Sequence, residues 1–351
     1  MKTLKTAPLV RRILPFWTAL LCAGPALADH MGPGNVGSGG GMAVFDPATL
    51  DAGHWAAGLR LAYTKPEQRS DAELASLAGQ HIHAHNTDYN QIGAIGLAYG
   101  ITHHLTVSAE LPYVRRDDLR EGTHVHSGGV AINAVEELGS VAGIGDLNLL
   151  AKYLLTEGEG PAFALIAGIK VPTGSTDQGS IAGERLETEH QPGTGSWNPM
   201  FGASASLPLG AMQLTASALY QLSTKGAQDT ELGDRVQGGI ALSHRFGSRP
   251  HIHGESHNHH HGDELDDERG AAGPAWDLFV ELGGEWEGRQ EVAGEIEEES
   301  GGSWIYAGPG VRFTNAGWSA SAGIALPLWQ NIRPSHPENS WRLSLSLGRA
   351  F

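Results

Sequence analysis

The chain has 351 residues, including 49 glycines, 18 histidines and a single cysteine. Acidic residues outnumber basic ones by 39 to 23, which gives a net charge of −16 at neutral pH. Binding to nucleic acids requires positive charge that displaces counterions, so the acidic balance argues against a nucleic-acid partner. No stretch approaches ~18 consecutive apolar residues, and this excludes a bundle of membrane-spanning helices.

Residues 1–28 have the features of a secretory signal peptide. A positive n-region precedes a short apolar h-region at residues 13–24, and Ala26-Leu27-Ala28 supplies a small-x-small cleavage signal. The h-region is shorter than the ~20 apolar residues that a spanning helix needs, so we expect cleavage before Asp29 rather than an anchor. Cleavage removes Cys22, and the mature chain then has no thiol chemistry.

From residue 54 onward, apolar and polar residues alternate in segments of about ten. In residues 318–328, for example, every second residue from Trp318 to Leu328 is apolar, and Ser319, Ser321 and Gly323 lie on the other face. This pattern is typical of strands that cross an outer membrane, although amphipathic strands also build soluble sandwiches.

Two further features favour the membrane. Aromatic residues gather near the expected strand ends, where the interfacial girdles of a barrel belong; they are Trp55, Tyr63, Tyr113, Tyr153, Phe163, Tyr220, Phe246, Trp276, Trp286, Phe313, Trp318 and Trp341. In addition, the last alternating segment ends on Phe351, which resembles the recognition signal of outer-membrane barrels, although Arg349 stands where an aromatic residue is usual. We therefore expect the barrel-assembly machinery and outer-membrane lipid as partners.

The predicted fold is all-β: a closed antiparallel transmembrane β-barrel of about 12 strands. The expected strands are 54–64, 91–99, 103–113, 144–155, 161–172, 196–207, 211–222, 233–246, 275–287, 302–313, 317–327 and 340–351. Tight turns are expected at 100–102, 156–160, 208–210 and 314–316. Long polar loops are expected at 65–90, 113–143, 173–195, 223–232, 288–301 and 328–339. Short periplasmic turns and longer outer loops are the asymmetry of such barrels, and the predicted location is the outer membrane of a Gram-negative bacterium.

Three regions of the mature chain are distinguished on this basis. Residues 29–53 form a Gly-rich N-terminal segment that is either periplasmic or a short plug. Residues 54–351 form the barrel. Within it, residues 247–274 are a His-rich loop that strand parity places on the periplasmic side.

Histidines suggest a second property of the chain. The 247–274 loop contains His251, His253, His257, His259, His260 and His261, and acidic residues follow closely. The outer loops add His81, His83, His85, His124 and His126. Imidazole suits zinc, copper and nickel, so the composition indicates weak binding of such ions, with a solvated loop as the alternative. No cofactor is required, and no spacing dictates a closed tetrahedral site.

Charged residues fall on the faces predicted to point inward. They are Arg60, Glu110, Asp146, Lys152, Lys170, Arg235, Asp277, Glu281, Glu285, Arg312 and Arg342. Such a lumen either holds water for passage or is closed by ion pairs, and the polar interior of this barrel class favours a narrow channel. No familiar nucleophile motif is present, and Ser243 and His244 face opposite sides of one strand, so we do not predict an enzyme.

Three segments resemble a known family: Gly143-Ile144-Gly145-Asp146-Leu147-Asn148-Leu149-Leu150-Ala151-Lys152-Tyr153, Gly168-Ile169-Lys170-Val171-Pro172-Thr173-Gly174-Ser175 and Gly193-Thr194-Gly195-Ser196. Together they resemble the outer-membrane family labelled "putative transporter of the meta-pathway of phenol degradation", over roughly residues 90–351. The resemblance implies a barrel and, loosely, a transport role.

A fainter likeness concerns residues 31–53. Their Gly-rich stretch, followed by Asp46-Pro47-Ala48, resembles the N-terminal plug of long-chain fatty-acid and aromatic-hydrocarbon uptake barrels, which have more strands and a longer plug. The leading functional hypothesis is an outer-membrane channel for a small solute, with divalent metal ions as cargo or regulators. The alternatives are uptake of small hydrophobic or aromatic compounds, and a non-conducting barrel that sequesters metal or mediates adhesion.

Overall fold

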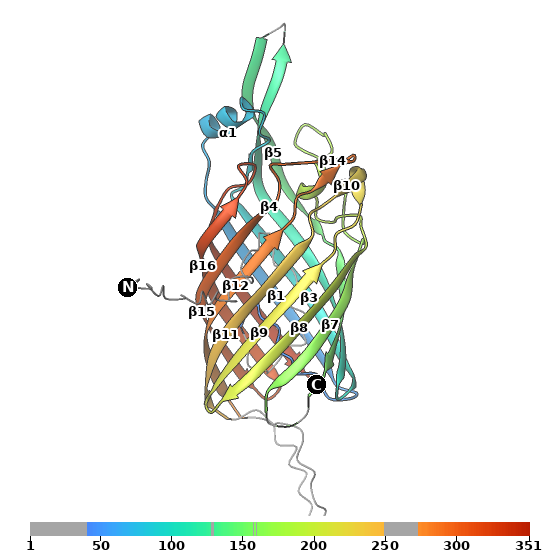
Figure 1. Cartoon of the computed structure of the whole chain (residues 1–351), viewed down its shortest axis with the longest axis vertical. Coiled ribbons are helices and arrows are strands. Elements are labelled where there is room, and N and C mark those ends of the chain that lie inside the picture. The colour runs from blue at the N-terminus through green and yellow to red at the C-terminus, as the bar shows by residue number, and fades with distance from the viewer. Residues whose placement is uncertain (1–40, 128–129, 157, 159, 249–272) are drawn as a thin grey trace, which may run out of the picture.

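A computed structural model describes residues 41–127, 130–156, 158, 160–248 and 273–351. The predicted signal peptide and the histidines of residues 251–261 therefore lie outside the described residues. Twelve antiparallel strands form one barrel (Figure 1). In spatial order they are β1 (Trp55–Pro66), β3 (Tyr89–Thr102), β4 (Leu105–Ser127), β6 (Leu147–Leu154), β7 (Ala162–Val171), β8 (Asn198–Leu209), β9 (Met212–Gln221), β11 (Arg235–Gly247), β12 (Ala275–Glu287), β15 (Gly302–Asn315), β16 (Trp318–Ile332) and β17 (Asn339–Ala350).

The barrel closes by pairing its first strand with its last. β1 and β17 run antiparallel from Ala56 opposite Ala350 to Lys65 opposite Trp341, with a register shift only at Pro66. Trp55 and Phe351 add reciprocal backbone hydrogen bonds of 2.8 and 2.9 Å at the seam. Closure leaves no free sheet edge, which is what a sheet in hydrocarbon requires. The predicted fold class and the twelve wall strands are confirmed.

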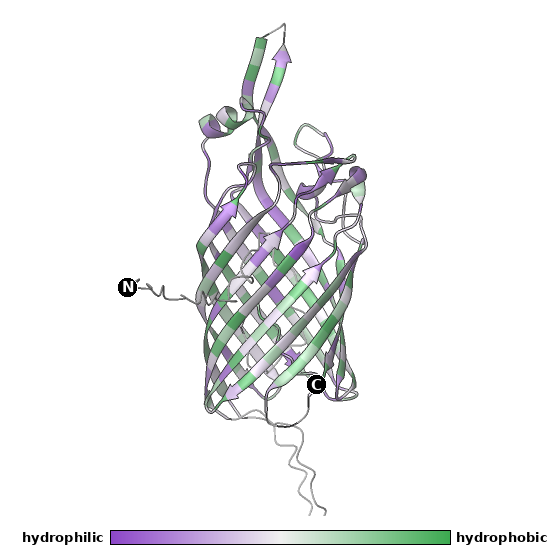
Figure 2. Cartoon of the chain, in the orientation of Figure 1, coloured by the Kyte–Doolittle hydropathy of each residue, from purple (hydrophilic) through white to green (hydrophobic). Residues whose placement is uncertain are grey.

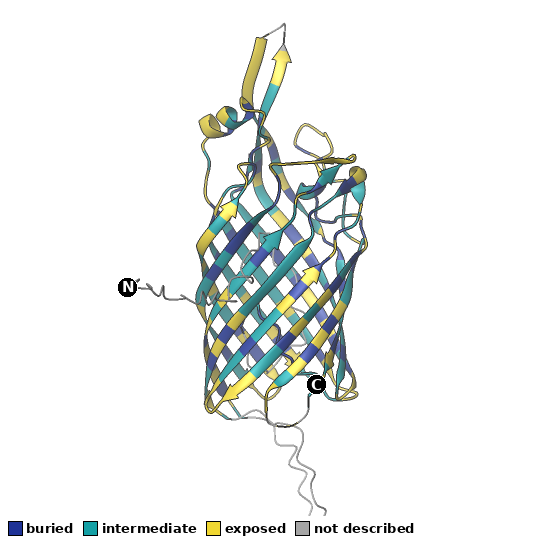
Figure 3. Cartoon of the chain, in the orientation of Figure 1, coloured by how far each residue is buried: buried dark blue, intermediate teal, exposed yellow. Residues whose placement is uncertain are grey.

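The outer face of the wall is apolar. Leu59, Ile95 and Val280 are more than half exposed although they lie in mid-strand, because strand alternation directs them away from the lumen. Hydrophobic residues recur along every wall strand (Figure 2), and exposed and buried positions alternate in the same strands (Figure 3). Within the described residues, no helix is both long and apolar enough to cross a bilayer. The exposed apolar band is the surface that lipid covers.

Aromatic side chains pair near both ends of the strands, as the sequence predicts. At one end the rings of Trp55 and Tyr99 lie 4.5 Å apart, and those of Trp276 and Phe313 lie 4.8 Å apart. At the other end Tyr63 stacks on Trp341 at 5.2 Å. Amphipathic rings in these positions suit the two membrane–water interfaces.

The connections between strands are short at one end of the barrel and long at the other. One of the predicted outer loops, however, is wrong. Residues 113–143 are not a loop, because β4 continues to Ser127 and pairs with β5 (Val130–Ile144). This hairpin stands beyond the barrel rim (Figure 1). Its residues are rich in charge, since no lipid faces them, and the apolar alternation used to find wall strands is therefore absent.

The remaining outer connections carry short elements. The 65–90 segment contains β2 (His85–Asn86) and α1 (Asp71–Ala78), which begins with a capping box between Ser70 and Glu73. Above the rim, β10 (Thr230–Glu231), β13 (Glu291–Val292) and β14 (Glu295–Ile296) form a small separate sheet. Two 3₁₀ turns, η2 (Thr188–His190) and η3 (Ala227–Asp229), complete this cover.

The wall is irregular where β15, β16 and β17 meet. The β15–β16 register shifts between Ile305 and Tyr306, and the ladder is interrupted at Gly308 and Pro309, as expected for a proline that lacks a backbone donor. The β16–β17 ladder ends at Ala325 opposite Arg342, although β16 continues to Ile332. Beyond that point the Gln330 side chain accepts from the Asn339 backbone N at 2.8 Å and donates to its O at 3.0 Å. A side chain thus bridges the two strands there.

Sidedness can be tested by labelling. Ser76 lies on α1 at the outer end and Ala211 lies in the tight β8–β9 turn at the opposite end, and both are exposed. We expect Ser76→Cys to react with a membrane-impermeant maleimide on intact cells. Ala211→Cys should react only after the outer membrane is permeabilised. The reverse pattern would contradict the assigned orientation.

A second prediction concerns the close approach of the β15 and β16 backbones in the irregular part of the wall. A Cβ added to Gly308 would lie 1.7 Å from the Ile324 backbone O, whereas one added to Gly93 would meet nothing within 4 Å. Gly308→Ala should lower the free energy of unfolding by about 1–3 kcal/mol, because the backbone must shift to accept it. Denaturant unfolding of the refolded barrel measures this, and Gly93→Ala is the matched control. Equal stability of the two variants would show that the β15 and β16 backbones move apart at little cost.

Candidate functional site

The lumen is lined by polar and charged side chains, most of which the alternation predicts. Each of the charged positions expected to point inward is at least partly buried, and most belong to wall strands. Arg245 and Glu287 were not predicted, although both continue the inward alternation of their strands. Both lie within the predicted strands 233–246 and 275–287, so the alternation already indicated them although the predicted set left them out.

Several of these residues pair across the barrel. Arg342 of β17 makes two hydrogen bonds to Glu285 of β12, at 2.5 and 3.2 Å, although β15 and β16 separate these strands in the wall. Arg60 of β1 reaches Glu110 of β4 at 2.9 Å, past β3. Each pair bridges the intervening strands on the inner side of the wall and narrows the lumen there.

Two other pairs lie along the wall. Arg235 bonds Glu287 at 3.0 Å between the neighbouring strands β11 and β12. Arg245 contacts both oxygens of Asp277 at 2.7 Å, in the planar two-bond geometry that arginine favours. Each of these buried charges thus has a partner of opposite sign, and their attraction offsets the free-energy cost of removing them from water.

Residues 41–50 occupy the lumen itself. The Ala43 backbone N donates to both oxygens of Glu281, at 3.1 and 3.2 Å, and the Phe45 N donates to Ser217 Oγ at 3.0 Å. Lys152 Nζ donates to the Asp46 backbone O at 2.8 Å. Strands on several sides of the barrel thus hold this segment, which we call the interior segment.

Side-chain packing also anchors the interior segment. Phe45 joins an apolar cluster with Ile166, Met200 and Leu219 on the inner wall of β7, β8 and β9. Val44 has no exposed surface. Sequence reasoning missed these wall partners, because inward apolar residues look like interruptions of an otherwise polar inner face.

Asp146 is the one predicted lumen residue with a different position. It lies between β5 and β6, where its carboxylate accepts from the Gly174 N at 3.0 Å, the Thr194 N at 2.8 Å and the Thr194 hydroxyl at 2.6 Å. A Cβ on Gly174 would lie 2.6 Å from the Gly193 Cα. The three conspicuous sequence motifs therefore meet at one point, where Asp146 holds two glycine-containing loops against the rim.

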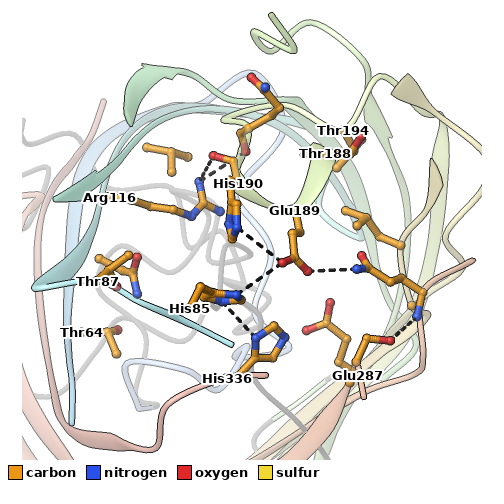
Figure 4. A pocket seen from close by; sticks show the side chains of 18 of the residues that line it. Thr64, His85, Thr87, Arg116, Thr188, Glu189, His190, Thr194, Glu287 and His336 are labelled. Carbon is orange, nitrogen blue, oxygen red and sulfur yellow. Dashed lines mark hydrogen bonds and ion pairs between the residues drawn. The ribbon is translucent and has the colours of Figure 1, made fainter. Parts of the chain in front are cut away.

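The outer mouth contains a cavity of about 190 Å³. His85, Glu189, His190 and His336 line it together, from three segments that are far apart in the sequence (Figure 4). Burial lowers the pKa of His190 to about 3 and that of His336 to about 4. Burial, reinforced by neighbouring glutamates, raises the pKa of Glu189 to about 8. Burial also holds the pKa of His85 well below its usual value, so the surroundings favour the neutral form of each of these groups.

The histidines predicted in the outer loops do not form one group. The rings of His81 and His124 lie 4.8 Å apart, and His124 and His126 lie 4.9 Å apart, on or beside the protruding hairpin. His83 is exposed and lies 3.5 Å from Glu121. Of these histidines, only His85 reaches the mouth cavity. Its partners Glu189, His190 and His336 had no sequence signal, because no regular spacing relates the loops that carry them.

Comparison with known proteins supports the fold and the family. Residues 107–280 match the model of a family described as "Putative MetA-pathway of phenol degradation". No curated protein matches the chain.

Solved structures of outer-membrane proteins are similar to the barrel. The COG4313 outer membrane channel from Pseudomonas putida F1 has a TM-score of 0.54 at 14% identity, over 87% of this chain and 98% of that one. The β domain of the Bordetella autotransporter BrkA gives a TM-score of 0.41 at 12% identity, over 86% and 100%. The CymD monoaromatic hydrocarbon channel gives 0.39 at 11% identity, over 91% and 96%.

The likeness at these identities concerns the fold. The matched family region runs from β4 into β12 and contains all three motifs that meet at Asp146. The chain is thus a closed antiparallel β-barrel with the fold of an outer-membrane channel, and the match over residues 107–280 confirms the resemblance that its sequence shows to the family described as "Putative MetA-pathway of phenol degradation".

Proposed function

We propose that the chain is an outer-membrane channel for small, largely apolar aromatic compounds, and that the interior segment closes it. The observation that carries the proposal is a recess of the lumen, here called the aromatic recess, in which Phe279 and Tyr306 lie near the charged residues Glu281, Glu285 and Arg342. Met42, Phe279, Tyr306 and Ile324 line a cavity of about 50 Å³ beside the interior segment. A second cavity of about 50 Å³ shares Met42 and Ala43 with the first.

The size of the recess supports a closed state. A benzene-sized solute needs a cavity on the order of 150 Å³, so neither space admits one as it stands. Met42 and Ala43 belong to the walls of both, and withdrawal of the interior segment would join them. The Arg342 guanidinium lies 4.3 Å from the Tyr306 ring centre, which leaves polar groups beside the ring for a phenolic hydroxyl.

The recess also lies beside the irregular part of the wall, where β15, β16 and β17 meet. Ala325 and Arg342 line the first cavity, and the β16–β17 ladder ends at this pair. An apolar solute that reaches the recess is therefore close to the lipid-facing surface, where Ile324 and Leu326 are exposed. This location supports passage of solutes that partition into hydrocarbon.

The other functions considered from the sequence receive less support. The lumen carboxylates that could attract divalent cations are paired with arginines, as in Glu285–Arg342 and Glu110–Arg60, which leaves little net negative charge to favour metal ions as cargo. The cross-lumen ion pairs would suit a non-conducting barrel. They suit equally a channel whose closed state is stable, and the aromatic recess is unexplained in a barrel that passes nothing.

Withdrawal of the interior segment from the lumen has a free-energy cost that can be estimated. The interior segment would lose several hydrogen bonds, each worth about 1 kcal/mol net, and the burial of Phe45, worth about 2 kcal/mol. The closed state is therefore favoured by several kcal/mol, and opening requires a ligand or a partner that stabilises the withdrawn state.

Release of the interior segment can be followed by labelling. Val44→Cys should react slowly with a small thiol reagent, because the position is fully buried. Glu281→Ala removes the acceptor for the Ala43 N and should accelerate labelling about tenfold or more, given about 1.5–3 kcal/mol for a hydrogen bond to a charged group. Glu298→Ala, in an exposed outer loop, is the control and should leave the rate unchanged. An unchanged rate in Glu281→Ala would contradict the anchoring.

The aromatic recess is tested by filling it. Gly283 lies on the wall of both cavities, and a Cβ added there has no neighbour nearer than 3.9 Å, whereas Gly93 of β3 lines neither cavity and a Cβ added there meets nothing within 4 Å. Gly283→Leu should reduce uptake of radiolabelled phenol and toluene into outer-membrane vesicles several-fold. Gly93→Leu should leave it unchanged, and arabinose should enter slowly in every case. Normal aromatic uptake by folded Gly283→Leu would overturn the proposal.

A further inference from the structure

The mouth cavity contains a cluster of donors whose geometry matches a transition-metal site. His85 Nδ1 lies 3.5 Å from Glu189 Oε1, and His190 Nε2 lies 3.6 Å from the same oxygen. One donor atom from each of the three residues lies within 4.8 Å of the other two. Zinc bonds of about 2.0–2.2 Å in a tetrahedron place neighbouring donors about 3.4 Å apart, so small side-chain movements would seat one ion.

Neighbouring residues already orient two of the three donors. His336 Nδ1 lies 3.0 Å from His85 Nε2, so a proton on Nε2 directs the lone pair of Nδ1 toward Glu189. Glu189 Oε2 accepts from Gln290 at 3.0 Å, which leaves Oε1 for the histidines. Metal-binding histidines and carboxylates in proteins are typically held by such outer hydrogen bonds.

His190 provides an independent sign of a missing ligand. Its Nε2 is buried and has no hydrogen-bond partner among the residues that the structure describes. Buried polar atoms are rarely left without a partner, so this nitrogen requires an explanation. It lies on the wall of the mouth cavity, as do His85, Glu189 and His336.

The backbone that carries these donors is fixed. Arg116 of β4 donates to the backbone oxygens of His190 and Gln191, at 3.1 and 3.3 Å. Arg69 donates to the backbone oxygen of His336 at 2.5 Å. A donor set held in this way loses little conformational freedom when an ion binds, unlike histidines on a solvated loop.

Charge in the surroundings favours a cation overall. Gln290 Nε2 donates to Glu189 Oε2 at 3.0 Å and to Glu297 Oε2 at 2.5 Å, which places these two carboxylates beside each other. Arg116 and Arg69 oppose a cation, but their guanidinium groups are engaged with backbone oxygens. A divalent ion would compensate this surplus of carboxyl groups.

We propose that His85, Glu189 and His190 bind one zinc-like divalent transition-metal ion at the channel mouth, and that His336 positions His85. Two imidazoles and a carboxylate suit zinc, nickel or copper rather than calcium or magnesium. Three protein donors leave a further coordination position to water, or to an oxygen donor of a solute in the cavity. The site is separate from the aromatic recess, so it does not depend on the proposed solute.

The experiment uses Co²⁺ and Zn²⁺ with the full-length refolded barrel. Competing ligands are removed in a background where His251, His253, His257, His259, His260 and His261 are changed to serine. This background protein should bind one equivalent of Co²⁺ with visible d–d absorption, and Zn²⁺ should displace it. Folding of every variant is checked by its electrophoretic shift on heating.

Variants then assign the donors. His190→Gln and His85→Gln should each abolish the absorption, and either one decides the matter if the other fails to fold. His124→Ala, on the exposed hairpin, should change nothing. His336→Ala should weaken Co²⁺ binding about 10–100-fold while the absorption persists at saturation. His336→Asn keeps an acceptor for His85 and should restore affinity.

Unchanged Co²⁺ binding in folded His85→Gln or His190→Gln would overturn the proposal, as would the absence of any stoichiometric binding in the background protein. Binding present in the wild-type chain but lost in the serine background would assign the metal to residues 251–261 instead. Aromatic uptake is measured separately on the same variants, so failure of the metal site is distinguishable from failure of the proposed channel.

Discussion

The closed hydrogen-bonded wall is the constraint on which the rest of this structure depends. Inside a bilayer no water can satisfy an exposed backbone donor or acceptor, and each unsatisfied group costs several kcal/mol. The β1–β17 pairing removes the last free edge and forces the twelve strands into a cylinder. Strand alternation then divides the side chains into a lipid-facing set and a lumen set, so one requirement of the backbone generates both the membrane surface and the interior.

The interior is closed rather than open because the chain fills it with its own residues. Twelve strands enclose a bore too wide for wall side chains alone to fill. The interior segment and the cross-lumen pairs Arg342–Glu285 and Arg60–Glu110 occupy that space. Most contacts with the interior segment use single hydrogen bonds from separate strands, and Phe45 is its one anchor in an apolar cluster. This mode of attachment holds a segment in place and still permits its withdrawal.

The outer rim follows a different physical rule, because water surrounds it. There the structure relies on local hydrogen bonds, such as those from Gly174 and Thr194 to Asp146 and those from Arg116 to the η2 backbone. These bonds bring together loops that are far apart in the sequence and build the mouth cavity between them. The three sequence motifs that meet at Asp146 therefore have a structural role at the rim, and the cavity beside them contains the clustered histidines.

Much of this protein could be predicted from the sequence, because a wall strand in a membrane has a strong and local signal. A residue such as Val280 must face lipid while its neighbours face the lumen, so twelve strands and most inward charges could be found from alternation alone. The β4–β5 hairpin escaped because water faces both of its sides and no alternation is required there. The pairing of Arg342 with Glu285 and the meeting of His85 with Glu189 and His190 were decided only by the tertiary structure. Such contacts depend on barrel curvature and loop packing, which bring distant residues together without leaving a pattern in the sequence around any one of them.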